Sequence, residues 1–262
     1  ALMPVHLLGN PCEMGEILEI ARRHNLLVIE DCCEAHGAEW REFKVGSISD
    51  VATFSFFFSH HISTIEGGMV VTNSGAIAER CRSMRAHGWI REMTGKDLIA
   101  LQHPEIDPRF LFAYPGYNFR PTELQGAFGI HQLPRLEGFI QTRRENAAYW
   151  NKELAQYADW LVLPEERPGT RHVWFAYPVT VTPEAPFSKS ELVRYLEECG
   201  LETRQIESGN MAIQPAMKSL KWRSGPLPNA QAIHERGFFW GNHHGITEPQ
   251  REAIVSYIRE FM

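Results

Sequence analysis

Short apolar runs alternate with amphipathic segments along the first part of the chain. Largely apolar runs cover residues 26–29, 51–56 and 69–72, and such runs are typical of strands that are buried on both faces of a sheet. Apolar side chains recur at helical spacing in residues 13–24 and 77–87. This alternation of strands with helices predicts an α/β domain with a mostly parallel sheet.

The second part of the chain predicts a long helical stretch followed by a smaller domain. Residues 121–157 have helical character interrupted by one proline, whereas residues 89–115 lose the periodicity and are predicted to form a long loop. A linker rich in proline and charge at 163–169 opens a small α+β domain at 163–262, after a large domain at 1–162. The small domain is predicted to contain strands at 173–179 and 203–206 and helices at 189–199 and 247–262.

Composition and charge restrict the class of protein. The 262 residues carry a net charge of −6, whereas a nucleic-acid partner usually requires a basic excess. No apolar run approaches the roughly 18 residues that a membrane span needs. The five cysteines form no CxxC pair, which favours a reducing compartment over a disulfide framework. We therefore expect a cytoplasmic protein that binds neither nucleic acid, nor a membrane, nor a metal.

Polar residues that could take part in catalysis or binding follow the apolar runs. Asp31 ends the first run, and a carboxylate there can hold the proton of a pyridinium nitrogen, although it can equally cap a loop. Ser55 lies near the end of the second run, where its hydroxyl can donate to a phosphate oxygen or simply be satisfied within the strand. His60 and His61 follow, and an imidazole suits general acid–base catalysis, although a surface pair in a loop is also possible.

Seven ordered blocks make the chain resemble the DegT/StrS family of nucleotide-sugar aminotransferases and dehydratases. The blocks are residues 3–6 with 9–10, 28–31 with 35–37, 45–47 with 50, 54–56, 66–68, 116–120 and 123–126. The resemblance covers nearly the full chain and implies a fold-type I transferase that depends on pyridoxal 5'-phosphate (PLP). Because the chain begins abruptly in a strand-like segment, we expect its large domain to be partial and its N-terminal portion to be missing.

The resemblance also implies roles for individual residues. Asp31 would contact the pyridine nitrogen of the cofactor, and Ser55 its phosphate. Asn118 would reach the phosphate in a neighbouring subunit, which implies a homodimer with a shared active site. Glu34 stands in the place of a common glutamine near the ring hydroxyl. His60 falls at the position of the lysine that binds the cofactor covalently in most members.

Histidine at position 60 resembles the 3-dehydratase branch of the family. Only a primary amine can attach the cofactor covalently, so the resemblance implies non-covalent pyridoxamine 5'-phosphate (PMP), the amine form of PLP. The implied substrate is a nucleotide-linked 4-keto-6-deoxyhexose of polysaccharide or lipopolysaccharide biosynthesis, with a glutamate-like amino donor. His60 would act as base and then as acid in removing the C3 hydroxyl.

Two alternatives and several substrate contacts stay open at this point. The chain could perform transamination only, or it could be a non-catalytic cofactor- or nucleotide-sugar-binding regulator that kept the fold. Candidate substrate contacts are Arg120, Arg204, Asn210 and Trp240. Surface charge or packing in the small domain explains the two arginines and the tryptophan equally well.

Overall fold

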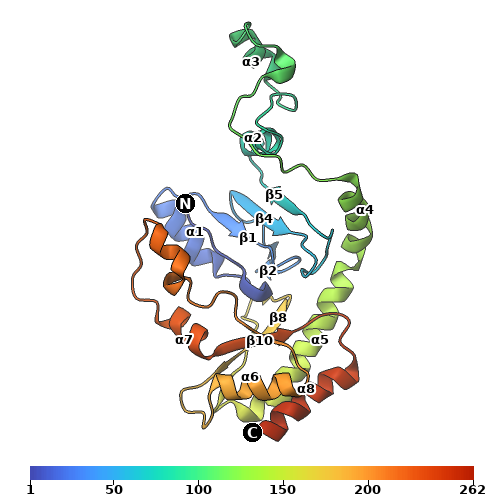
Figure 1. The fold of residues 1–262 in the computed structure, drawn as a ribbon, viewed down its shortest axis with the longest axis vertical. Coiled ribbons are helices and arrows are strands. Elements are labelled where there is room, and N and C mark those ends of the chain that lie inside the picture. The colour runs from blue at the N-terminus through green and yellow to red at the C-terminus, as the bar shows by residue number, and fades with distance from the viewer. The chain divides into compact units, whose positions relative to one another are not determined.

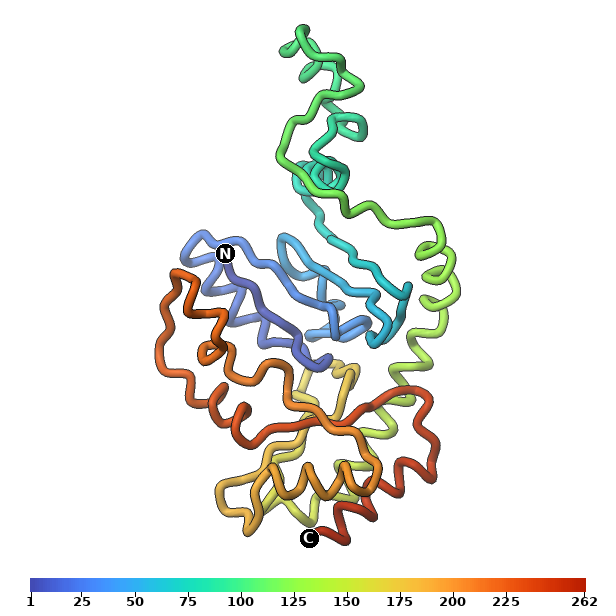
Figure 2. The backbone as a smooth tube through the Cα atoms, viewed as in Figure 1, coloured from blue at the N-terminus to red at the C-terminus, as the bar shows by residue number.

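The computed structural model describes residues 1–262, which form two compact units (Figure 1, Figure 2). The first unit comprises Ala1–Leu7, Pro11–Leu136 and Gly169–Arg171, and the second comprises Leu8–Asn10, Glu137–Pro168 and His172–Met262. The boundary expected between residues 162 and 163 therefore falls earlier, near the start of helix α5 (Leu136–Leu154). This helix buries Trp150 and Leu154 in the core of the second unit, and a helix belongs to the core that covers its apolar face.

The sheet of the first unit has the strand order β1-β4-β5. Its strands are β1 (Ile29–Asp31), β4 (Val51–Ser55) and β5 (Gly68–Val71). β1 and β4 are parallel, and bridges from Leu2 and Val5 continue the parallel arrangement beyond β1. β5 is antiparallel to β4, so the sheet is mixed where a mostly parallel sheet was expected. The reason is that the chain returns from β4 to β5 without a crossover helix, and direct returns join antiparallel neighbours.

Capping side chains fix the starts of the helices in the first unit. Helix α1 (Met14–Arg23) begins after Glu13, and helix α2 (Gly75–Arg85) begins after Ser74, with each side chain accepting a backbone N–H of the first turn. Helix α4 (Glu123–Gln132) begins with a capping box. These caps satisfy N–H groups that have no partner within a helix. They place the helices close to where the hydrophobic periodicity predicts them.

The remaining elements of the first unit were not predicted. Helix α3 (Lys96–Gln102) lies inside the segment expected to be a loop, which has a small core of Ile90, Met93 and Leu111. A second small sheet has the order β3-β2-β7. Its strands are β2 (Glu39–Trp40), β3 (Phe43–Lys44) and β7 (Thr170–Arg171). The 3-10 helices of the whole chain are η1 (Leu7–Gly9), η2 (Pro108–Phe110), η3 (Leu133–Arg135), η4 (Ala155–Tyr157), η5 (Met211–Ile213) and η6 (Pro215–Ser219).

The second unit contains an antiparallel sheet of order β6-β8-β10-β9. Its strands are β6 (Leu161–Val162), β8 (Ala176–Val181), β9 (Thr203–Gln205) and β10 (Gly237–Gly241), and its helices besides α5 are α6 (Lys189–Glu198), α7 (Pro228–Arg236) and α8 (Glu248–Phe261). Its core is rich in aromatic rings, with Trp150, Tyr177 and Trp240 in mutual contact. Strand β10 was not predicted, because a short and mostly buried apolar run cannot be distinguished from a buried helix segment by periodicity alone.

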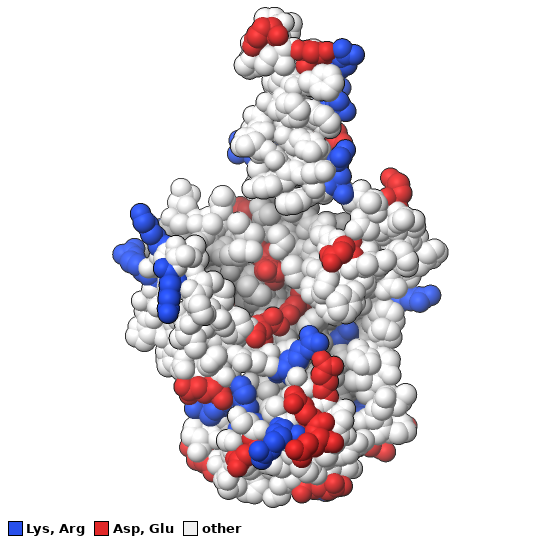
Figure 3. Space-filling view, viewed as in Figure 1, with Lys and Arg blue, Asp and Glu red and all other residues white.

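The surface features agree with the composition. None of the helices has the length and apolar character needed to cross a membrane. Acidic and basic side chains are interspersed on the face shown in Figure 3, as expected for a chain with a modest negative net charge.

Candidate active site

The carboxyl ends of β1 and β4 bring Asp31 and Ser55 to one edge of the first unit's sheet. Asp31 is opposite Thr53 in the parallel register, and Ser55 lies two residues further along β4. Because side chains alternate between the faces of a sheet, all three project from the same face. Asp31 accepts a hydrogen bond from Cys33 N–H (3.1 Å), and Ser55 Oγ accepts one from Phe57 N–H (3.2 Å). The hydroxyl hydrogen of Ser55 therefore remains available to another acceptor.

His60 lies in a tight loop directly after β4. Backbone hydrogen bonds of 2.9 Å close this loop, from Phe56 N–H to the Gly67 carbonyl and from Thr64 N–H to the Phe56 carbonyl. His60 Nδ1 is 3.3 Å from the carbonyl oxygen of Ser55, which can only accept, so Nδ1 carries the hydrogen. When the ring is neutral, its lone pair is therefore on Nε2, which is the arrangement that a general base requires.

His36 is a buried histidine beside this loop to which the sequence analysis assigned no role. Its side chain is 4% exposed, and its ring centroid lies 5.5 Å from that of Phe56 and 5.9 Å from that of His61. Neither ring nitrogen has a hydrogen-bond partner, which is uncommon for a buried polar group. Burial, and to a smaller extent the charge of His60, lowers the pKa of His36 to about 4. His36 is therefore neutral near pH 7 and adds no positive charge beside His60.

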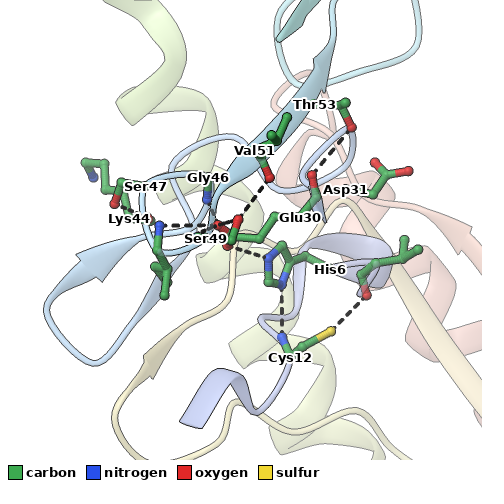
Figure 4. A network of polar contacts seen from close by, with 12 residues as sticks. His6, Cys12, Glu30, Asp31, Lys44, Gly46, Ser47, Ser49, Val51 and Thr53 are labelled. Atoms are coloured by element: carbon green, nitrogen blue, oxygen red, sulfur yellow. Dashed lines mark hydrogen bonds and ion pairs between the residues drawn. The ribbon is translucent and has the colours of Figure 1, made fainter. Parts of the chain in front are cut away.

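Glu30, the residue before the site carboxylate, holds a buried hydrogen-bond network on the opposite face of β1 (Figure 4). Its Oε1 accepts from the backbone N–H groups of Ile48 (3.2 Å) and Ser49 (3.1 Å) and from the Ser49 hydroxyl (2.8 Å). Its Oε2 accepts from Gly46 N–H (3.0 Å) and from His6 Nε2 (3.0 Å). Five hydrogen bonds therefore fasten the 46–49 turn and the N-terminal segment to β1.

The hydrogen bonds of His6 define its tautomer. Cys12 N–H donates to Nδ1 (3.0 Å), so Nδ1 carries the lone pair and Nε2 carries the hydrogen that Glu30 accepts. Ligand atoms of His6, Glu30 and Cys32 lie within 4.8 Å of one another. The Glu30 carboxylate already accepts hydrogen bonds from five donors. These hydrogen bonds explain the cluster without a metal ion, as a support for the strand that carries Asp31. The sequence did contain an indication of this buried network, namely the adjacent acids Glu30 and Asp31 on a strand. Neighbouring strand residues face opposite sides of the sheet, so only one of the two carboxylates can face the site.

The Glu30 network predicts a specific dependence of stability on pH. Burial alone would raise the pKa of Glu30, but the hydrogen bonds from His6, Gly46 and Ser49 outweigh it and hold the pKa below its ordinary value of 4.5. The stabilisation is therefore fully present above pH 4.5 and is lost as pH falls through the lowered value. Urea unfolding between about pH 3 and pH 6 should show a shallower acid loss in Glu30→Gln than in the wild type. Equal acid slopes would contradict the role of this carboxylate.

The other residues expected at the site in the first unit make local interactions. Glu34 lies half-buried in the turn that follows β1. Asn118 forms an isolated antiparallel bridge with Ala86, and its Oδ1 accepts from Arg120 Nε at 3.1 Å. Both Asn118 and Arg120 are exposed. Their side chains are thus oriented by each other at the surface of the first unit.

The three substrate candidates of the second unit differ in what they can contact. Arg204 is exposed and donates to Glu202 Oε1 from Nε (3.1 Å) and Nη2 (2.9 Å), which matches the surface-charge alternative. Trp240 is completely buried in the hydrophobic core. Packing therefore accounts for Trp240, and the expected substrate contact is corrected, because a fully covered side chain cannot meet a ligand. Asn210 is 5% exposed and donates to Gln231 of α7 at 2.9 Å, which gives it a scaffold position.

Known proteins of similar sequence and fold include sugar 3-dehydratases and a lipopolysaccharide biosynthesis protein. The chain is 37% identical to a GDP-4-keto-6-deoxy-D-mannose 3-dehydratase from Yersinia pseudotuberculosis over 265 residues, covering 99% of this chain and 66% of that protein. It is 33% identical over 275 residues to the lipopolysaccharide biosynthesis protein RfbH from Salmonella typhimurium, covering 100% of this chain and 62% of that protein. Its fold resembles that of E. coli GDP-4-keto-6-deoxy-D-mannose-3-dehydratase with bound hydrated PLP, at a TM-score of 0.88 and 32% identity over 97% of this chain and 66% of that one.

These matches cover the whole of this chain but only part of its relatives. The chain spans between 62% and 66% of the length of the three proteins above. The family profile of the DegT/DnrJ/EryC1/StrS aminotransferases matches residues 1–259. Together with the mixed α/β fold, this match confirms the fold class expected from the sequence. The chain belongs to the DegT/DnrJ/EryC1/StrS aminotransferase family.

Proposed function

We propose that this chain carries the cofactor and substrate residues of a 3-dehydratase that uses PMP on a nucleotide-linked 4-keto-6-deoxyhexose. The observation that supports it is His60: the family resemblance puts it where a covalent cofactor link would need a lysine, and its Nδ1–H donates to the Ser55 carbonyl, which makes Nε2 the basic nitrogen of the neutral ring. Two relatives named as 3-dehydratases, at 37% and 32% identity, support the same reaction.

The donor set at the sheet edge fits a pyridoxamine cofactor. Asp31 and Ser55 project from one face of adjacent parallel strands. A carboxylate suits a protonated pyridine nitrogen, and a hydroxyl with an available hydrogen suits a phosphate oxygen. Two residues complete the proposed set, Glu34 near the ring hydroxyl and Asn118 toward the phosphate in a second subunit. When bound, PMP would supply an amine for the C4 ketone and an electron sink for the reaction.

His60 supplies the acid–base chemistry in this proposal. Its Nδ1–H, held by the Ser55 carbonyl, keeps Nε2 as the basic nitrogen. Nε2 takes up a carbon-bound proton and then donates it to the departing C3 hydroxyl, so one ring acts first as base and then as acid. Neutral His36 nearby favours this cycle, since a permanent positive charge there would oppose protonation of His60.

The proposal includes a homodimer and an amino donor. Asn118 and Arg120 are exposed and held by each other, which suits a side chain directed at a neighbouring subunit. A glutamate-like donor would restore the amine form of the cofactor after each turnover. The cytoplasm, where nucleotide sugars are made, is the proposed location.

The fate of the C3 oxygen tests the proposal. The full-length protein is incubated with PMP and GDP-4-keto-6-deoxymannose, and the sugar product is read by mass spectrometry. We expect the C3 oxygen to be lost, because His60 can protonate a leaving hydroxyl. The control is the same mixture without PMP, in which the sugar should be unchanged.

Two other outcomes would overturn the proposal in different ways. A 4-amino sugar that keeps its C3 oxygen would mean that the protein only transaminates. Tight PMP binding without any change in the sugar would favour a binding or regulatory role.

A further inference from the structure

The loop between β4 and β5, residues 56–67, contains a strained residue close in sequence to the proposed base. Ile65 has φ +72°, in the left-handed region that branched side chains rarely adopt. Such a conformation persists only where the surrounding structure holds it, and it is common at functional sites. Ile65 is 59% exposed, so packing of its own side chain contributes little to this support. The support must therefore come from neighbouring groups.

Two side chains hold the carbonyl of the next residue, Glu66. Thr64 Oγ1 donates to this oxygen at 2.7 Å, and Gln125 Nε2 donates to it at 2.7 Å. Because a carbonyl oxygen has two lone pairs, the two donors together satisfy it. Thr64 belongs to the loop itself, whereas Gln125 lies 59 residues further along the chain, on α4. The loop is therefore fastened to a separate element directly after its strained residue.

The amide of Gln125 is itself fixed at its other end. Its Oε1 accepts from the backbone N–H of Thr122 at 2.7 Å and from the Thr122 hydroxyl at 3.2 Å, as part of the capping box of α4. The amide nitrogen is thereby directed at the Glu66 carbonyl. A glutamate would serve the capping box equally well, but its carboxylate has no hydrogen to donate. Glutamine at this position thus provides a contact that the helix cap does not need.

Helix α4 also packs against the loop (Figure 1). At Gly129, one turn after the start of the helix, a Cβ would lie 3.3 Å from Thr64 Cγ2, so the helix and the loop are in close contact. Thr64 N–H in turn donates to the Phe56 carbonyl at 2.9 Å, which closes the loop. His60 lies inside this closed segment, with Nδ1 3.3 Å from the Ser55 carbonyl. The position of the imidazole therefore depends on the closure that α4 supports.

We infer that Gln125 is a positioning residue for the acid–base step, which keeps the 56–67 loop in the conformation that places His60. The inference rests on the proposed function, in which His60 moves the proton. Gln125 acts here through the Glu66 carbonyl and not through contact with substrate or cofactor. Misplacement of a reacting group by about 1 Å can cost on the order of 10²-fold in rate, so one hydrogen bond to this loop is enough to affect turnover.

Gln125→Glu tests the inference, because it keeps the acceptor for Thr122 and removes the donor to Glu66. In the full-length protein we expect kcat for loss of the C3 oxygen to fall roughly 10–100-fold, with little change in KM for the sugar or in the dissociation constant of PMP. Amide hydrogen exchange in the 56–67 loop should be faster even without cofactor. Two controls should behave as the wild type. Thr122→Ala weakens the helix cap and leaves the donor to Glu66, and Gln141→Ala removes an exposed amide of α5 that donates to Glu145.

Replacing Ile65 with Asn tests whether Gln125 acts by holding the strained conformation. Asparagine adopts positive φ more readily than a branched residue, so the loop should depend less on its tie to α4. The loss of kcat caused by Gln125→Glu should consequently be smaller in the Ile65→Asn protein than in the wild type. An equal loss in both backgrounds would count against the inference.

A readout that does not require dehydration separates this inference from the proposed reaction. His60→Lys places an amine at the same position, and borohydride attaches PLP to it only where residue 60 faces the cofactor. Slower attachment in His60→Lys/Gln125→Glu, with no turnover in the wild type, would support the inference and overturn the reaction.

Three results would overturn the inference itself. Unchanged kcat in Gln125→Glu, with the C3 oxygen still removed, would leave the reaction standing without a role for Gln125. Faster loop exchange with unchanged kcat and unchanged attachment of PLP would make the contact to Glu66 merely structural. A His60→Lys protein that borohydride does not label would show that the loop does not place residue 60 at the cofactor.

Discussion

Replacing His60 with Asn is expected to slow removal of the C3 oxygen by about 10²–10⁴-fold, the usual contribution of a positioned acid–base group. Asparagine has a similar size, and its amide can still donate to the Ser55 carbonyl, but it has no nitrogen that takes up a proton. PMP binding should change little, because Asp31 and Ser55 remain in place on their strands. Single-turnover loss of the C3 oxygen and the dissociation constant of PMP are the two measurements.

Two further variants sharpen this result. His60→Lys introduces a primary amine, so borohydride should attach PLP covalently to this variant and not to the wild type. His103→Asn, at an exposed position next to α3, is the matched control and should keep the wild-type rate. A His60→Asn protein with full activity would show that another group moves the proton.

Replacing Glu30 with Ala is expected to lower the free energy of unfolding by about 3–5 kcal/mol, as when one partner of a buried polar pair is removed. The change leaves His6 Nε2–H and the N–H groups of Gly46 and Ser49 without their acceptor in a buried place. Urea unfolding followed by circular dichroism measures the loss. Because β1 also carries Asp31, the affinity for PMP should fall in the same variant.

A surface glutamate provides the comparison for Glu30. Glu19 on α1 forms an exposed ion pair with Arg23, so Glu19→Ala should cost no more than about 1 kcal/mol. Glu30→Gln keeps one acceptor oxygen but places an NH₂ group against existing donors, and should lie between the two alanine variants. Similar losses in Glu30→Ala and Glu19→Ala would refute the network as a main support of β1.

The sequence predicted helices correctly where a capping residue and the hydrophobic periodicity indicated the same element. The helix expected at 13–24 is α1 (Met14–Arg23), and the one expected at 189–199 is α6 (Lys189–Glu198), since each has an apolar stripe and a capping residue. The central strand β10 was missed because a short apolar run can belong either to a buried strand or to a buried helix. The antiparallel direction of β5 was missed, although the chain passes from β4 to β5 without a helix between them, which favours antiparallel pairing.

The candidate site was only partly readable for the same physical reason. The residue types at positions 31, 55 and 60 indicate their chemistry, but nothing local reveals that His60 Nδ1 meets the Ser55 carbonyl and so leaves the lone pair on Nε2. For Trp240, the residue type suggested a role that the structure does not support. Its residue type suits a sugar contact, yet its position in β10 buries it completely.

The sequence by itself determined the α/β class, the order of most helices and strands, the resemblance to the family, and the histidine at position 60. These depend on residue identity and on short-range spacing, which a sequence states directly. Only the tertiary structure decided the union of α5 with the second unit and the His6–Glu30 network behind Asp31. Each of these depends on which buried groups meet across the fold, where burial and hydrogen-bond satisfaction outweigh local preference.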